Sequence, residues 1–87
     1  MSPLYRIHDL DEYNHMKDVV EGYSQRIIYQ GEELLLHHIE TFPIRVEDNP
    51  PVYYAFCVLL QIKQMNYILV SIKDVYDIIQ NNDNKNL

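Results

Sequence analysis

Four histidines lie close to carboxylates in the sequence, and this combination of side chains can bind a metal ion or transfer a proton. His15 follows Asp11 by four residues and Glu12 by three, so a helix would place all three on one side. His8 has Asp9 as its neighbour. Because the sequence holds no recognised pattern such as His-Glu-x-x-His, we interpret these groups as exposed histidines beside acids.

A second group of this kind is the stretch HHIE, which ends at Glu40. His38 and Glu40 share a face only if this segment is a strand, and the adjacent His37 and His38 are expected to diverge in either a helix or a strand. We predict no metal site here and leave the roles of the histidines open. A metal-dependent enzyme that uses histidines and acids is the third of three candidate functions.

The sequence contains neither a phosphate-binding loop nor the motif of a nucleophilic serine. The two glycines, Gly22 and Gly31, are nine residues apart, whereas phosphate-binding loops need closely spaced glycines. Ser2, Ser24 and Ser71 are the only serines, and none lies in a Gly-x-Ser-x-Gly elbow. We therefore expect a protein that is not an enzyme, with no catalytic residue and no cofactor.

The single cysteine, Cys57, lies inside an apolar run and is expected to be buried and unreactive. A lone cysteine gives no support to a cross-linked, secreted scaffold, so an intracellular, cytoplasmic location is expected. Residues 1–13 lack the basic start and apolar block of a signal peptide. The longest apolar run, 52–60, is shorter than the about 20 residues of a membrane-spanning helix, so we expect no membrane segment.

Negative charge is concentrated in the first half of the chain, and the formal net charge of the whole is −6. Residues 9–48 contain ten acids against three bases, whereas residues 49–87 contain three of each. A surface of this sign repels phosphate backbones. Direct nucleic-acid binding is therefore disfavoured, and a protein partner with a basic surface is favoured.

Carboxylates at helical spacing, together with tyrosines, are the predicted partner-binding groups. Asp11 and Asp18 are seven residues apart, so on a helix they share a face at a distance of about 10 Å. The adjacent Tyr53 and Tyr54 point to opposite faces of a strand, which favours exposure of one ring. Such groups suit contact with lysine and arginine side chains of a partner. The predicted partner-binding set is Asp11, Asp18, Glu21, Glu32, Glu33 and Tyr54.

An amphipathic helix over about residues 10–29 is the clearest predicted element. Asp9 can cap its N-terminus, with Glu12 three residues later as in a capping box. Apolar residues then recur at steps of three and four, which is typical of one helical stripe. Gly22 is the most favourable point for an earlier end of this helix.

Residues 32–41 admit two interpretations. Apolar residues at helical spacing, followed by the helix-terminating Pro43, favour a short helix at 32–41, which is our prediction. The alternative is a hairpin that turns at Gln30-Gly31.

The most apolar part of the chain predicts a β-hairpin, with strands near 53–62 and 67–73 around the polar stretch KQMN. A C-terminal helix at 74–81 follows. The predicted fold class is α+β, with residues 1–81 as a single compact domain and 82–87 as a flexible polar tail. An all-α helical bundle is the alternative, because the apolar spacing near the C-terminus also fits helices.

These features predict a small, acidic, non-enzymatic interaction protein that docks a face of carboxylates and tyrosines onto a basic surface of another protein. One version is an inhibitor that occupies the nucleic-acid site of a nuclease or polymerase, by an analogy of size and charge with nucleic-acid mimics, small phage-encoded inhibitors and immunity proteins. The alternative is a structural protein whose surplus apolar surface forms a homodimer.

Overall fold

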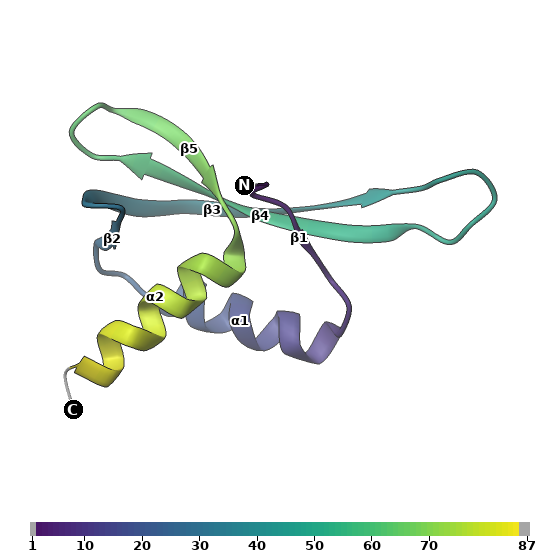
Figure 1. Ribbon diagram of the computed structural model, residues 1–87, viewed down its shortest axis with the longest axis horizontal. Coiled ribbons are helices and arrows are strands. Elements are labelled where there is room, and N and C mark those ends of the chain that lie inside the picture. The colour runs from purple at the N-terminus through teal and green to yellow at the C-terminus, as the bar shows by residue number, and fades with distance from the viewer. Residues whose placement is uncertain (1, 86–87) are drawn as a thin grey trace.

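The computed structural model describes residues 2–85, with side chains through residue 82. Over this part of the chain the fold is α+β, with two helices and a five-stranded antiparallel sheet (Figure 1). The all-α alternative is therefore wrong. The elements in chain order are β1 (Tyr5–Arg6), α1 (Leu10–Gly22), β2 (Ile27–Tyr29), β3 (Glu32–Ile44), β4 (Val52–Gln61), β5 (Asn66–Val70) and α2 (Ile72–Lys85).

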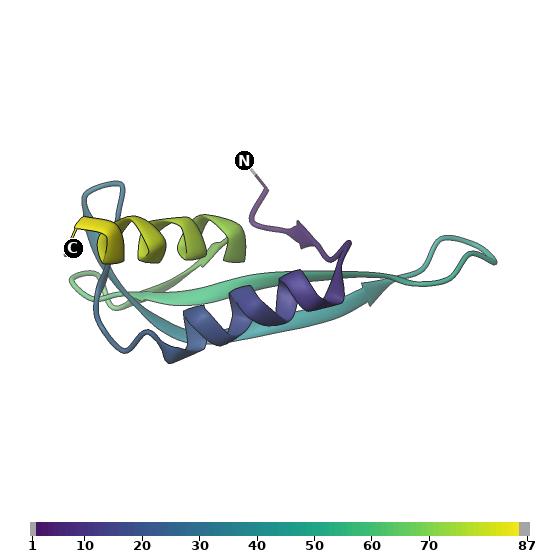
Figure 2. The same cartoon turned by 90° about the horizontal axis from the view of Figure 1, so that it is seen from below.

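The sheet is built around a long hairpin of β3 and β4, which pair along nearly their whole length. β2 pairs only with the first three residues of β3. The other edge of β4 is shared, because β5 pairs with its second half and β1 with two residues near its start. The tip of the hairpin, around residues 45–51, extends well beyond both helices (Figure 2).

Both helices lie on the same side of the long strands (Figure 1), and the core lies between the helices and that side of the sheet. On β4 the inward residues Ala55, Cys57 and Leu59 are fully buried and alternate with residues that are only partly covered. The helices supply the other half of the core: Tyr13, Met16, Val20, Ile72, Val75 and Ile79. We call the opposite side of the sheet, which neither helix covers, the outer face.

Helix α1 begins where the sequence predicts and ends earlier than its full predicted length. The Asp9 side chain accepts hydrogen bonds from the backbone N–H groups of Asp11 and Glu12, at 2.9 and 3.2 Å, and so caps the helix. The helix ends at Gly22, the predicted early stop, and the extension to residue 29 is wrong. In the sequence the apolar stripe of this helix continues to Ile27. In the structure Ile27 belongs to strand β2 and is buried in the core.

The predicted helix at 32–41 is wrong, because this segment is the first part of strand β3. Gln30 and Gly31 both have positive φ, 50° and 80°, which is the backbone that a tight hairpin turn between β2 and β3 requires. The alternative interpretation of this stretch, a hairpin turning at Gln30-Gly31, is therefore confirmed. As a strand, the segment pairs with β4 and buries Leu34 completely.

The predicted hairpin at 53–62 and 67–73 is confirmed as β4 and β5, although β5 ends at Val70. Helix α2 begins at Ile72 and reaches Lys85, so it exceeds the predicted 74–81 at both ends. Residues 82–85 of the predicted tail therefore belong to this helix, and residues 86–87 lie outside the described residues. Neither described helix is long and apolar enough to cross a membrane.

Candidate functional site

The exposed side of α1 is acidic. Asp11, Asp18 and Glu21 are all exposed on it, and we call this surface the acidic helix surface. The Glu21 carboxylate lies 4.0 Å from the Lys17 ammonium, an exposed pair one turn apart that contributes little to stability. Among the described residues, Asp11 and Asp18 have no ion-pair partner. The structure therefore brings three of the six predicted partner-binding residues together.

The other two predicted carboxylates lie at the start of β3 and already have intramolecular partners. Glu32 accepts a hydrogen bond of 2.6 Å from the Gln61 side-chain amide on β4. Glu33 accepts one of 3.3 Å from the Arg26 guanidinium. Both side chains are thus committed within the chain, and they do not extend the acidic helix surface.

Tyr54, the sixth predicted residue, lies on the outer face and so on the other side of the sheet from the helices. It is opposite Phe42 in the strand register, and the two rings stack with centroids 6.1 Å apart. Phe56 packs edge-on against the same Phe42 ring, at 5.9 Å. The predicted single face of carboxylates and tyrosine is therefore divided between two sides of the molecule.

The outer face carries an apolar surface that the sequence analysis did not single out. Antiparallel register places residues directly opposite one another on the same face of the sheet. Tyr67 and Leu69 are 58% and 50% exposed, and the β4 residues between them and β3 are half-buried. The apolar part of the outer face includes Leu35, Phe42, Tyr54, Phe56, Val58, Leu60, Tyr67 and Leu69. The signal was present in the nearly unbroken apolar run of β4, because a strand that is apolar at every position has two apolar faces.

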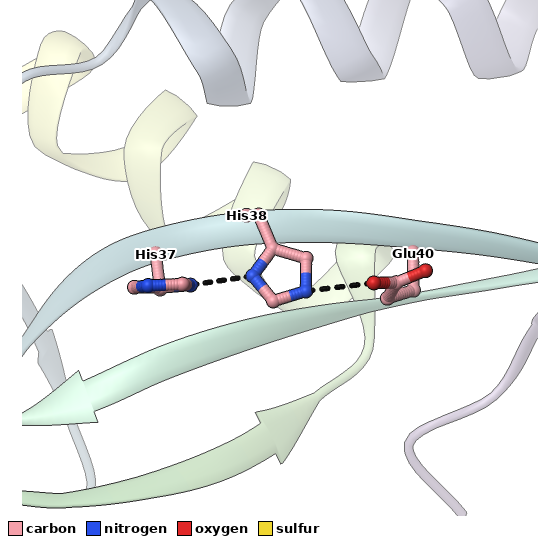
Figure 3. A network of polar contacts seen from close by, with 3 residues as sticks. All are labelled: His37, His38 and Glu40. Carbon is pink, nitrogen blue, oxygen red and sulfur yellow. Dashed lines mark hydrogen bonds and ion pairs between the residues drawn. The ribbon is translucent and has the colours of Figure 1, made fainter.

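His37, His38 and Glu40 form a chain of polar contacts at the β3 side of the outer face (Figure 3). The Nδ1 atoms of the two histidines are 2.5 Å apart, and His38 Nε2 lies 2.9 Å from a Glu40 carboxylate oxygen. The His37 ring also packs edge-on against Tyr67, with centroids 5.0 Å apart. His38 and Glu40 thus share a face, as the sequence analysis expects only for a strand at this segment.

The predicted divergence of His37 and His38 is wrong, and a β-bulge explains why. The register of β3 against β4 shifts between Leu36 and His38, so the extra residue His37 interrupts the alternation of side chains. His15, which the sequence analysis placed on one side of a helix with Asp11 and Glu12, packs its ring against Tyr76 of α2, with ring centroids 5.9 Å apart. Within residues 2–82, no three histidine, cysteine or acidic side chains are grouped closely enough to hold a metal ion.

Two shallow grooves border these surfaces. One, of about 430 Å³, lies between the end of α1 and the edge of β3, and it brings Glu21 near His37 and His38. The other, of about 380 Å³, is lined mainly by apolar side chains that include Leu10 and Tyr53. Neither groove contains the one thiol of the chain.

Cys57 is fully buried beneath the helices, as the sequence predicts. Burial raises the pKa of the Cys57 thiol to about 12, because the apolar core disfavours the charged thiolate. The thiol therefore stays protonated near neutral pH and acts as a small apolar side chain of the core.

Comparison with known proteins gives no relative from which a function could be carried over. No protein-family model matches the sequence, and searches of curated proteins and of solved structures found no significant match.

Proposed function

We propose that this protein is a small, non-enzymatic interaction module that docks the acidic helix surface onto a basic surface of another protein. One observation carries the proposal. Residues 9–22 contain five carboxylates against a single lysine, and Asp11 and Asp18 face solvent with no cation beside them among the described residues.

Electrostatic complementarity gives such a surface its selectivity. Asp11 and Asp18 stand two turns apart on α1, about 10 Å along the axis, which matches lysine or arginine side chains spaced along a partner. Long-range attraction between opposite charges accelerates the encounter and excludes partners of the same sign. A nucleic-acid site of a nuclease or polymerase is one kind of basic surface, and the proposed inhibitory version of the function is occupation of such a site.

A helix is a suitable support for this role because its exposed charges are not needed for folding. The buried side of α1, formed by Tyr13, Met16 and Val20, holds the helix against the sheet. The opposite side is then free to carry charges that act on a partner.

Affinity capture from the native host, followed by quantitative binding of the recovered partner, tests the proposal. We expect retention to fall steeply between about 50 mM and about 500 mM salt, because ions screen charge pairs at a surface. The variant Asp11→Asn/Asp18→Asn should bind about tenfold more weakly. The matched control Glu47→Gln/Asp48→Asn removes the same charge from the distant hairpin tip and should bind as the wild type does.

Two results would contradict the proposal. One is a partner retained equally at both salt concentrations. The other is a partner for which the α1 variant and the hairpin-tip control lose the same affinity, since overall charge alone would then explain the effect.

A further inference from the structure

The outer face carries apolar area that folding of one chain does not use. The helices cover the inner side of the sheet, whereas Tyr67 and Leu69 remain about half exposed beside the stacked rings of Phe42 and Tyr54. Antiparallel sheets usually place polar residues on an uncovered face. Here the middle of the uncovered face is apolar, and its polar residues Arg6, His38 and Glu40 lie on the strands to either side of β4.

The chain exposes more surface than a compact monomer of its mass. A monomeric protein of 10.4 kDa exposes about 5,400 Å² by the usual scaling of surface with mass. This chain exposes 6129 Å². The excess is roughly 700 Å², to which the projecting hairpin tip (Figure 2) and the uncovered outer face both contribute. An uncovered sheet face can supply the roughly 800 Å² that each partner buries in an interface of standard size.

The charges on the outer face indicate which partner fits. Arg6 of β1 lies beside Tyr54, and Glu40 of β3 lies beside Phe56, so the two opposite charges flank β4 on opposite sides and two residues apart. Consider a two-fold axis that runs parallel to β4 above the outer face. It places the β3 side of one copy over the β1 side of the other, and each position along the strand keeps its height. It therefore brings each copy's Glu40 over the region of the other copy's Arg6.

We propose that a second copy of this chain covers the outer face, giving a two-fold symmetric dimer in which the two sheets pack face to face. The centre of the interface is Phe56 and Val58. On both sides Arg6 of one copy approaches the Glu40 carboxylate of the other, which also contacts His38 Nε2 of its own chain. Sheets packed in this way lie about 10 Å apart with their strands within about 30° of each other. The acidic helix surfaces point outward in this arrangement, so the net charge of −6 on each copy does not concentrate at the contact.

Analytical ultracentrifugation of the full chain between about 1 and about 100 µM tests the inference, since standard interfaces commonly dissociate within or below this range. We expect a particle of twice the 10.4 kDa of the chain. The variant Leu69→Lys places a charge in the interface and should yield a monomer. Leu10→Lys makes the same change at a side chain that is 64% exposed on α1, and it should leave the dimer intact.

Charge reversal then tests the two-fold pairing itself. Arg6→Glu and Glu40→Arg should each weaken dimerisation about tenfold, because each places like charges together. The double variant restores opposite charges and should recover most of the affinity. Circular dichroism verifies the fold of each variant, and Tyr67→Lys serves as a second interface variant because this side chain is 58% exposed.

A monomer throughout the concentration range overturns the proposal, because a second copy would then not cover the outer face. A dimer that survives both Leu69→Lys and Tyr67→Lys also overturns it, because the contact would lie elsewhere. A double variant weaker than either single variant excludes the Arg6–Glu40 pairing and the axis along β4. These experiments use the chain alone, so their results do not depend on the proposed basic partner. In turn, Asp11→Asn/Asp18→Asn leaves the outer face unchanged, so the two proposals can fail separately.

Discussion

The two faces of strand β4 are both largely apolar, but they are used differently. On the inner face of β4, Ala55, Cys57 and Leu59 have no exposed surface. On the outer face the same strand presents Tyr54 and Phe56, which are larger and only partly covered. The small side chains of Ala55 and Cys57 let the helices approach β4, whereas the aromatic rings of Tyr54 and Phe56 on this strand point away from the helices.

This difference separates the residues that hold the fold from those that are available for contact. If the aromatic rings served mainly to stabilise one chain, they would lie beneath the helices, where burial is complete. They lie instead on the side that the helices leave open. The charged surface of α1 forms a third region, since its carboxylates face solvent above a helix that is anchored by its apolar side.

One leucine from each face provides the most direct test of this difference. Leu59→Ala removes a fully buried side chain beneath the helices and should lower the free energy of unfolding by about 2–5 kcal/mol. Leu69→Ala changes a side chain that is 50% exposed and should cost less than about 1 kcal/mol in dilute solution. Urea denaturation followed by circular dichroism measures both.

The same pair of variants distinguishes folding from association. At about 100 µM, where a dimer of standard interface size contributes, the deficit of Leu69→Ala should grow while that of Leu59→Ala stays constant. Equal losses for the two leucines at low concentration would show that the outer face is as much a part of the fold as the inner face.

The buried thiol sharpens the comparison through pH. In the unfolded chain Cys57 ionises near its ordinary pKa of 9.0, whereas burial raises its pKa in the folded chain to about 12. Between these values the unfolded state holds fewer protons than the native state, so stability falls as pH rises. We expect a loss of about 1.4 kcal/mol per pH unit above pH 9, relative to Cys57→Ala.

Urea denaturation of wild type and Cys57→Ala at pH 8, 9 and about 10.5 provides the measurement, and the variant subtracts the titration of tyrosines and lysines. Parallel stability curves for the two proteins would show that water reaches the Cys57 side chain and that the inner face is less closed than the structure indicates.

The sequence predicts an element of this fold correctly where its local patterns all favour the same secondary structure. Asp9 and the apolar stripe gave the start of α1, and Gly22 gave its end, because capping and helix breaking act over a few residues. The stretch after Gly31 fitted helix and strand alike. Pairing with β4, a contact between distant residues, decided in favour of a strand, and no local pattern reports such pairing.

The candidate site was predictable to the same extent. The exposed positions of Asp11 and Asp18 followed from helical spacing alone. The partners of Glu32 and Glu33 required knowledge of which strands lie together. The contact between His37 and His38 depended on a bulge, which shifts the register of one strand by a single residue and leaves no clear mark in the sequence.

The acids of α1 supply the smallest and most selective test of the division between fold and contact surface. Asp9→Ala removes the oxygen that accepts the backbone N–H groups of Asp11 and Glu12, and it should lower the free energy of unfolding by about 1 kcal/mol. Asp18→Ala removes an exposed carboxylate of the same charge from the same helix and should change stability by less than about 0.5 kcal/mol. Asp18→Ala should weaken partner binding more than Asp9→Ala does. The reason is that Asp9 has its hydrogen bonds within the chain, whereas Asp18 has no ion-pair partner among the described residues. Denaturant unfolding and partner binding, measured on both variants, therefore separate the acids that hold α1 in place from those offered to a partner, and a single order in both measurements would remove that distinction.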